Sequence, residues 1–375
     1  MHHMIGYIRD EPELLARTFV EGDDAIQHLV GGFRTGRWGR LVIVGVGSSY
    51  TAALMAVPAF RLHCPIPVEV LPSTELTYYQ ERWLGPGTVV LSVSRSGERG
   101  WVVEAQRAAH AAGAYTVAMT GIVDSLLASD ADLLLPTSEG PEITFSKTKS
   151  VITCAGLLTQ LALRLAPDSD VEAQRRLSEL EHVPELIRQT IRASEPTIAG
   201  IVPTLAGIEH VSLCGSAGNF GVALEGGIKI QETSFVPTRA DDTGNCLHGV
   251  LGTSDAKWLM IALVGNRDAE LSRAVLHLAG VAGAQRMAIT APGLVGAADA
   301  EHVVEIASSV DPVLAGLVYL PCLQLLTYYL TLARNKDPDA PSYMKAQFDA
   351  MLPEGREEPE LRGGASLAGA AGMGG

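Results

Sequence analysis

The sequence predicts an α/β protein in which two similar units follow one another, each a mainly parallel sheet in a three-layer αβα arrangement. Short runs of valine, isoleucine and leucine alternate with helical stretches, which is typical of parallel sheets flanked by helices. The alternation occurs twice along the 375 residues at nearly constant spacing. A chain of this length can form two domains, each with its own core.

The first half contains four continuous apolar runs of strand length. These are Leu41–Gly45, Thr88–Val93, Tyr115–Met119 and Ala131–Pro136. Helices are expected at Ser49–Leu62 and from about Arg99 to Ala112. Apolar runs of this kind are buried on both faces of a sheet, as central parallel strands are.

The second half repeats this order. Strands are expected at His210–Cys214, Trp258–Val264 and Arg286–Thr290, with a helix beginning near Asn219 after the first of them. Matching positions in the first three elements of the two halves are separated by 169, 169 and 171 residues. Three elements that keep one offset indicate an internal duplication.

These patterns divide the chain into six parts. They are an N-terminal segment (1–25), a first domain (26–165), a connecting helix (166–195), a second domain (196–335), a C-terminal segment (336–352) and a disordered tail (353–375). The connecting helix is inferred from Asp168–Arg192, which is rich in Glu and Arg with spaced leucines. The tail is rich in Gly, Ala and Glu, which disfavours a packed core.

The composition of the chain limits which classes of partner and which compartment are expected. The net charge is −14 and no run of Lys and Arg occurs, so a nucleic-acid partner is not expected. The five cysteines are dispersed and lack C-x-x-C spacing, which indicates reduced thiols and no zinc site. The N-terminus has no apolar leader, so we expect a cytoplasmic protein. Pro312–Ala333 carries no charge over 22 residues, but its prolines, Gln324 and tyrosines favour a core helix, at a subunit interface or not, over a membrane span.

Two serine–glycine turns follow successive strands, at Gly45–Tyr50 and Ser92–Gly97. Each opens a helix, so backbone N–H groups and the positive end of the helix dipole face the strand tip, where open α/β sheets bind ligands. Serine hydroxyls add donors that suit a phosphate monoester. Serine and glycine also cap helices where no ligand binds, but two such turns at consecutive strand ends favour anion binding.

No cofactor is predicted. A dinucleotide fingerprint has the form G-x-G-x-x-G, and here Tyr50 occupies the position of the third glycine after Gly45 and Gly47. A Walker loop does not occur either. The corresponding turn of the second half, Gly215–Gly218, carries one hydroxyl. We therefore expect the second domain to contribute catalytic residues and contacts rather than a second phosphate site.

Several motifs resemble the sugar isomerase (SIS) domain family in order and spacing. In the first half they are Gly47-Ser48-Ser49-Tyr50, Ser94-Arg95-Ser96-Gly97-Glu98 and Ser146-Lys147-Thr148-Lys149-Ser150. The second half resembles the isomerase portion of glucosamine-6-phosphate synthase in Ala223–Glu232, Leu247-His248-Gly249, Leu325–Tyr328 and Asp339–Lys345. The resemblance covers about Ile26 to Gln347 and implies two tandem SIS-type domains of flavodoxin-like architecture.

The resemblance also implies roles for single residues. Glu225, Lys229 and Glu232 fall on one helix face; Glu232 would be the proton-transferring base, while Lys229 would hold sugar hydroxyls. His248 would help to open the sugar ring in the partner subunit's site, and Lys345 would meet the open-chain C1 carbonyl. The alternatives are an exposed charged stripe, a surface histidine and a solvated lysine.

Phosphate and substrate binding would fall to the serine turns and their neighbours. This predicted set is Ser48, Ser49, Ser94, Arg95, Ser96, Arg99, Thr148, Lys149 and Glu225. Arg95 replaces a glutamine of the synthase, as in the deaminase branch, and Arg99 replaces a threonine near the phosphate. A guanidinium at Arg99 can grip a phosphate or point away from it.

The expected function is metal-independent isomerisation of an aminosugar 6-phosphate with loss of its amine, in a homodimer with shared sites and no membrane partner. About 25 residues precede the region of resemblance and none is a cysteine, so the expectation excludes a glutamine-hydrolysing half. Two alternatives stay open: a fructosamine-6-phosphate deglycase, and a sensor that binds a sugar phosphate without turnover.

Overall fold

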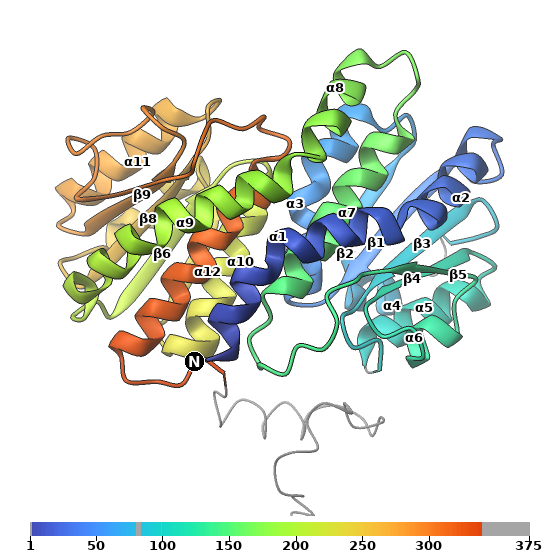
Figure 1. The fold of residues 1–375 in the computed structure, drawn as a ribbon, viewed down its shortest axis with the longest axis horizontal. Coiled ribbons are helices and arrows are strands. Elements are labelled where there is room, and N and C mark those ends of the chain that lie inside the picture. The colour runs from blue at the N-terminus through green and yellow to red at the C-terminus, as the bar shows by residue number, and fades with distance from the viewer. Residues whose placement is uncertain (1, 80–83, 99, 340–375) are drawn as a thin grey trace, which may run out of the picture.

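The computed structural model describes residues 2–79, 84–98 and 100–339. Two parallel sheets lie at opposite ends of the molecule, with helices between them and around them (Figure 1). The two sheets consist of five strands each. The α/β class with parallel sheets flanked by helices, predicted from the alternating pattern, is therefore confirmed.

The first sheet is built from the first half of the chain. Its strands are β1 (Arg40–Gly45), β2 (Val68–Pro72), β3 (Thr88–Val93), β4 (Tyr115–Thr120) and β5 (Leu133–Pro136), in the order β2-β1-β3-β4-β5. All neighbouring pairs are parallel. Strand β2 was not predicted. It lies at an edge and its residues are only half-buried, so its sequence lacks the continuous apolar run of a central strand.

The second sheet has the same order when its strands are counted along the chain. Its strands are β6 (His210–Gly215), β7 (Thr238–Asp242), β8 (Trp258–Val264), β9 (Gln285–Thr290) and β10 (His302–Glu305), in the order β10-β9-β8-β6-β7. The edge strands β7 and β10 were not predicted. Strand β7 reads Thr-Arg-Ala-Asp-Asp, which carries no strand signal in isolation.

Twelve α-helices occur in the described residues. They are α1 (His3–Glu21), α2 (Asp23–Arg34), α3 (Ser48–His63), α4 (Ser73–Tyr79), α5 (Trp101–Ala111), α6 (Leu126–Ser129), α7 (Lys149–Leu165), α8 (Val171–Leu180), α9 (Val183–Ile201), α10 (Gly218–Ser234), α11 (Ala269–Val281) and α12 (Ala315–Ala333). The prediction of one connecting helix over 166–195 is wrong. Two helices occupy this segment, because α8 ends at Leu180 and Pro184 opens the first turn of α9.

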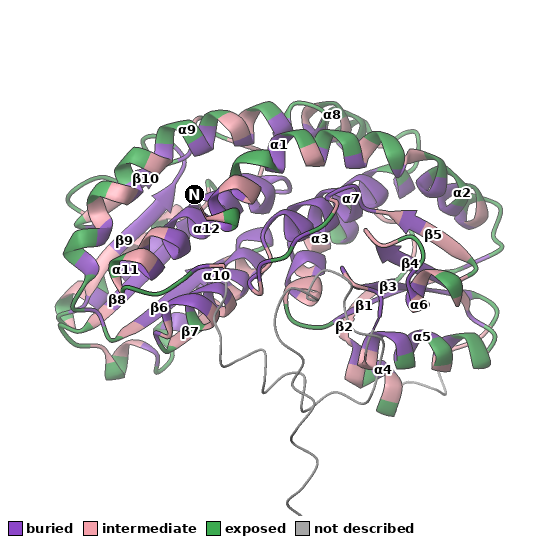
Figure 2. Cartoon of the chain, turned by 60° about the horizontal axis from the view of Figure 1, so that its bottom comes forward, coloured by how far each residue is buried: buried purple, intermediate pink, exposed green. Residues whose placement is uncertain are grey.

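Helices α3, α7, α10 and α12 form a buried layer between the sheets (Figure 2). One hydrophobic cluster runs through this layer and includes Ile43 and Leu91 of the first sheet together with Leu213 and Ile261 of the second. Each sheet also packs its outer face in a cluster of its own. The expectation of two separate cores is therefore correct only for the outer faces.

Helix α12 is the most apolar helix of this layer. Among the described residues it alone is long and apolar enough to cross a membrane, but 89% of its most apolar window is buried inside the protein. The hydroxyl of Tyr319 donates a hydrogen bond to the backbone oxygen of Val264, 2.7 Å away, which ties the helix to β8. The structure thus places this segment in the core, as predicted.

Candidate functional site

Three charged side chains of α10 lie together at the boundary of the two halves. The Nζ atom of Lys229 is 2.7 Å from Oε2 of Glu232 and 3.4 Å from Oε1 of Glu225. The exposed fractions of these side chains are 2% for Lys229, 0% for Glu225 and 18% for Glu232. The alternative of a solvent-exposed charged stripe is therefore excluded.

The first half of the chain supplies partners for both carboxylates. Helix α10 packs against α3, and Oγ1 of Thr51 on α3 donates to Oε2 of Glu225 at 2.5 Å. Oγ of Ser146 donates to Oε2 of Glu232 at 2.9 Å. Neither Thr51 nor Ser146 was among the predicted site residues. Thr51 follows Ser48 by three residues on the same helix face, which is the signal that could have found it.

Burial and ion pairing set the protonation of this cluster. Burial raises the pKa of the Glu225 carboxyl, and the nearby Lys229 charge and the Thr51 hydroxyl offset only part of that rise. Burial alone would lower the pKa of Lys229, but attraction to Glu232 and Glu225 outweighs it, so the pKa of Lys229 is raised. Lys229 is therefore a fixed cation beside Glu232 at neutral pH.

The predicted phosphate turns lie side by side at the carboxyl edge of the first sheet, because β1 and β3 are parallel neighbours. Gly47 adopts φ 55°, which is the left-handed region, and lets α3 begin at Ser48. Oγ of Ser94 accepts a hydrogen bond from the Gly97 N–H at 3.1 Å and keeps its own proton for a ligand. Burial raises the pKa of Glu225, and a hydrogen bond from the Ser48 hydroxyl offsets part of that rise, so this turn reaches the α10 cluster.

Ser49 and Ser96 are half-buried in the same two turns. Arg95 is buried, and its charge acts on Glu139 and Glu142. Burial raises the pKa of Glu139 and the Arg95 charge offsets part of that rise, whereas at Glu142 the Arg95 charge adds to the effects of Lys147, Ser150 and Thr148 that lower the pKa. The structure thus directs the charge of Arg95 toward the interior carboxylates of the first half, whereas the serine hydroxyls stay at the turn.

Thr148 and Lys149 are engaged within their own loop. Oε1 of Glu142 accepts hydrogen bonds from the Thr148 N–H at 2.6 Å, the Thr148 hydroxyl at 3.0 Å and the Lys149 N–H at 3.1 Å. The Lys149 ammonium donates to the backbone oxygen of Pro141 at 2.6 Å. These contacts show how the loop is held, and a direct contact of either side chain with substrate stays a prediction.

Glu142 is a further residue that the sequence did not single out. Its buried carboxylate caps the N-terminus of α7, also accepting from the Ser150 hydroxyl at 2.7 Å. Burial would raise the pKa of this carboxyl, but the Lys147 charge and the hydrogen bonds from Ser150 and Thr148 lower it. An ionised Glu142 therefore fixes the loop that carries Ser146 against Glu232.

His248 lies apart from the α10 cluster within one chain. It follows the short 3₁₀ helix Asn245–Leu247 and is exposed, near the carboxyl end of β7. The first residue of α10, Gly218, lies at this same sheet edge, whereas Glu232 is 14 residues further along the helix, or about 21 Å. Service to the partner subunit's site stays a prediction, and Arg99 and Lys345 lie outside the described residues.

Among residues 2–79, 84–98 and 100–339, no group of three or more His, Cys, Asp or Glu side chains is arranged to hold a metal ion. The five cysteines are free thiols, four of them buried. The polar groups of the α10 cluster and the two serine turns are hydroxyls, carboxylates, the Lys229 ammonium group and the Arg95 guanidinium group, which can bind an anion and move protons.

The first half matches a known family. Residues 37–164 match the family model described as the SIS domain. These residues are a SIS domain. The chain is also homologous to the isomerase portion of isomerizing glutamine–fructose-6-phosphate aminotransferases. It is 28% identical over 345 residues to the enzyme of Thermococcus kodakarensis and 28% identical over 355 residues to that of Pseudomonas syringae.

Those alignments cover 91% of this chain, and the chain spans little more than half of the relatives, 56% and 57% of their lengths. Solved structures share the fold of this chain. The C-terminal domain of the Francisella tularensis aminotransferase has a TM-score of 0.80 at 22% identity, covering 90% of this chain and 98% of that domain. Glucosamine-6-phosphate deaminase of Thermotoga maritima has a TM-score of 0.72 at 22% identity, covering 91% and 97%.

Proposed function

We propose that this protein is an isomerase and deaminase of an aminosugar 6-phosphate, built from two SIS-type domains. The observation that carries the proposal is the buried Glu225–Lys229–Glu232 cluster, which meets the serine turn of the first half through Ser48, Thr51 and Ser146. The relatives named above support the choice of a phosphosugar, and they are aminotransferases and a deaminase by name.

The phosphate would bind at the carboxyl edge of the first sheet. Ser48 and Ser49 open α3, and Ser94 and Ser96 belong to the neighbouring turn. Their hydroxyls and the N–H groups at the start of α3 are donors, as a phosphate monoester requires. The sugar chain would then extend from this edge toward α10, where the carboxylates lie.

Proton transfer would fall to Glu232. In the open-chain aldehyde form of the substrate, its carboxylate removes the C2 proton, and the electron pair forms an enamine with charge building on O1. The Lys229 ammonium group, 2.7 Å from Glu232, is placed to stabilise that charge. Return of that proton to C1, with transfer of an N–H proton to O1, leaves a C1 hydroxyl and an imine at C2. Water then adds to C2, and ammonia departs to leave the ketose 6-phosphate.

Glu232 suits this task because it is the most exposed of the three charged residues, at 18%, and so can reach a ligand. Ser146 and Lys229 both contact its Oε2 atom, which leaves Oε1 for the substrate. Ring opening before this step would fall to His248 of the partner subunit, and Lys345 would act at C1.

The test is incubation with glucosamine, galactosamine and fructoselysine 6-phosphates, with ammonia, ketose phosphate and amino acid measured separately. Glu232→Gln should lower ammonia release from the preferred aminosugar by about 10²–10⁴-fold. The matched control is Glu270→Gln, which changes an exposed carboxylate on α11 and should keep full activity.

Each other outcome has a meaning. Full activity of Glu232→Gln would contradict its role as base. Release of lysine from fructoselysine 6-phosphate without ammonia would show a deglycase instead. Tight binding of all three compounds without any product would show a sensor.

A further inference from the structure

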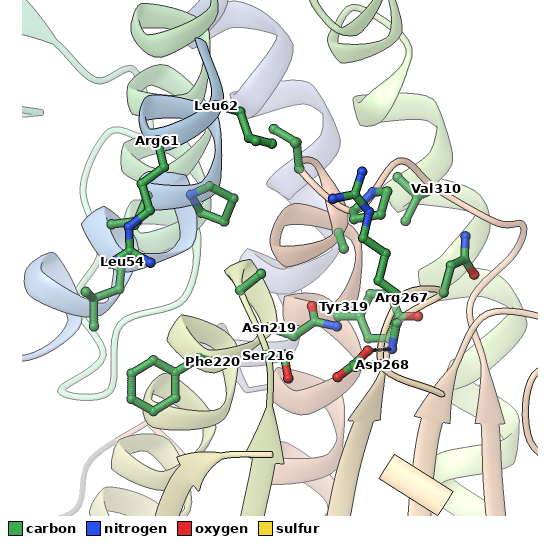
Figure 3. A pocket seen from close by; sticks show the side chains of 18 of the residues that line it. Leu54, Arg61, Leu62, Ser216, Asn219, Phe220, Arg267, Asp268, Val310 and Tyr319 are labelled. Atoms are coloured by element: carbon green, nitrogen blue, oxygen red, sulfur yellow. Dashed lines mark hydrogen bonds between the residues drawn. The ribbon is translucent and has the colours of Figure 1, made fainter. Parts of the chain in front are cut away.

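A cavity of about 410 Å³ lies at the carboxyl edge of the second sheet, away from the α10 cluster (Figure 3). It is enclosed by the second half of α3, the turn between β6 and α10, the loop after β8 and the segment before α12. Its volume is within the range of about 300–1,000 Å³ that small-molecule sites occupy.

The turn in this cavity has the same backbone as the first phosphate turn. Gly47 before α3 has φ 55° and ψ −127°, and Ala217 before α10 has φ 53° and ψ −124°. In both halves a long helix starts at the next residue. The cavity is thus the counterpart of the candidate active site, with the roles of α3 and α10 exchanged.

The counterpart lacks the catalytic groups. When the starts of α3 and α10 are aligned, the positions of Glu225, Lys229 and Glu232 are occupied on α3 by Met55, Ala59 and Leu62. None of these three side chains can take up or release a proton near neutral pH. Helix α3 therefore supplies no equivalent of the proposed base and its ammonium partner.

The cavity instead holds two arginines that face it from opposite sides, Arg61 on α3 and Arg267 in the loop after β8 (Figure 3). In the part of the chain that the structure describes, neither guanidinium has a hydrogen bond or an ion pair with another side chain. Two carboxylates, Asp242 and Asp268, line the cavity as well. Asp268 accepts hydrogen bonds from the Gly265 N–H and the Thr243 hydroxyl, and Asp242 accepts from the Gly244 N–H. The two guanidinium groups keep their donors for the oxygens of an anion, which they can bind by paired hydrogen bonds.

An unmet acceptor lies deeper in the cavity. Asn219 is 3% exposed, and its Nδ2 donates to the backbone oxygen of Leu263 at 3.4 Å, whereas its Oδ1 has no hydrogen-bond partner among the described residues. A buried acceptor without a donor is unfavourable, and a ligand hydroxyl would satisfy it. The Ser216 hydroxyl, 3.0 Å from Oγ1 of Thr243, lies at the same turn.

We propose that this cavity is a second, non-catalytic binding site for a small hydroxylated anion of the sugar-phosphate class. Arg61 and Arg267 bind the anionic group, Oδ1 of Asn219 accepts from a hydroxyl, and the ring of Phe220 covers an apolar face of the ligand. The single hydroxyl of the turn had argued against a second phosphate site. The charge comes from residues outside the turn, which the motif did not contain.

The site can be counted by isothermal titration calorimetry of the full chain. Glucosamine 6-phosphate, fructose 6-phosphate and inorganic phosphate serve as probes in a Glu232→Gln background, in which turnover is slowed. We expect two binding events per chain for at least one sugar phosphate. Arg61→Ala and Arg267→Ala should each weaken one event by about tenfold and leave the other unchanged.

Two further variants sharpen the result. Asn219→Asp keeps the shape of the side chain but adds a negative charge, so it should weaken the same event by tenfold or more. Arg273→Ala, which removes a half-buried arginine of α11 paired with Glu270, should change neither event. With Glu232 restored, the variants at Arg61 and Arg267 should keep their catalytic rate at saturating substrate.

A single binding event for every probe, or a second event that is unchanged in all three cavity variants, would overturn the proposal. Failure of the proposed function has a different signature, since it would appear as absent turnover in the unmodified chain while the second event persists. Preference for inorganic phosphate over both sugar phosphates would also contradict the site, because Asn219 would then have no ligand hydroxyl to accept from.

Discussion

The turns at the carboxyl edges of the two sheets have the same backbone conformation, but each turn faces a different helix. The first turn meets Glu225, Lys229 and Glu232 on α10, whereas the second meets the mostly apolar second half of α3, with Arg61 beside it. A repeated fold thus supplies two places for a ligand, and the opposing helix decides which one can carry out chemistry. Three predictions test the first edge and its supports, and a fourth concerns a buried carboxyl outside both edges.

The largest effect is expected from removing the cation of the first edge. Lys229→Met leaves Glu225 and Glu232 buried beside one another without a counter-charge, so the free energy of unfolding should fall by about 3–5 kcal/mol. Urea denaturation followed by circular dichroism measures this. Glu225→Gln added to Lys229→Met should recover much of the loss. Equal stability of Lys229→Met and the unmodified chain would show that the cluster is solvated.

The next effect concerns how the first edge is completed. If His248 acts in the partner's site, His248→Ala should lower the catalytic rate about 10²-fold. Mixing it with Glu232→Gln after unfolding and refolding together should restore about a quarter of the normal activity, through hybrid dimers with one intact site. A monomer in sedimentation at micromolar concentration, or no recovery in the mixture, would contradict shared sites.

The buried cap of α7 should have an effect of intermediate size. Glu142→Ala removes a carboxylate that accepts hydrogen bonds from Thr148, Lys149 and Ser150. We expect a loss of about 2 kcal/mol in unfolding free energy, together with a fall in activity because Ser146 is no longer held against Glu232. Glu142→Gln keeps the shape and should lose less. An unchanged melting curve in Glu142→Ala would contradict the capping role.

The smallest effect concerns Glu11, which is fully buried on α1. Burial raises the pKa of its carboxyl well above the usual range, and Gln324 offsets only part of that rise. The folded state thus holds this proton more tightly than the unfolded state, so stability from this group is complete below about pH 4.5 and is lost as the pH rises toward the folded pKa.

Glu11→Gln should therefore match the unmodified chain near pH 4.5 and exceed its unfolding free energy by about 1 kcal/mol at pH 8. Thermal melts across this range measure the difference. Glu13→Gln, an exposed neighbour on the same helix, is the control and should show no such trend. A gain of the same size at both pH values would mean that Glu11 is not a titrating group.

The central strands and both serine turns could be predicted because their signals are local: a continuous apolar run, or glycine followed by serine. The spacing of Glu225, Lys229 and Glu232 likewise placed them on one helix face. The edge strand β7 could not be predicted, since its residues Thr238–Asp242 are polar and pair only because β6 lies beside them.

The pairing of Ser146 and Thr51 with the carboxylates could not be predicted from the sequence. Ser146 reaches Glu232 across 86 positions, and Thr51 reaches Glu225 across 174, so no spacing rule connects them. In the sequence Glu142 is an ordinary loop residue, and only the structure shows that its carboxylate caps the N-terminus of α7. Predicting the cavity would have required the knowledge that the C-terminal end of α3 faces the second sheet.

The hydrophobic layer shared by both sheets has a consequence for how this molecule is made and lost. Helices α3, α7, α10 and α12 bury one another between the two sheets. Neither half alone can therefore shield the apolar faces of its inner helices from water. The protein should melt in a single cooperative step. A fragment ending before α9 would expose apolar helix faces and aggregate. The ribosome therefore has to synthesise the chain as far as α12 before either sheet can fold stably.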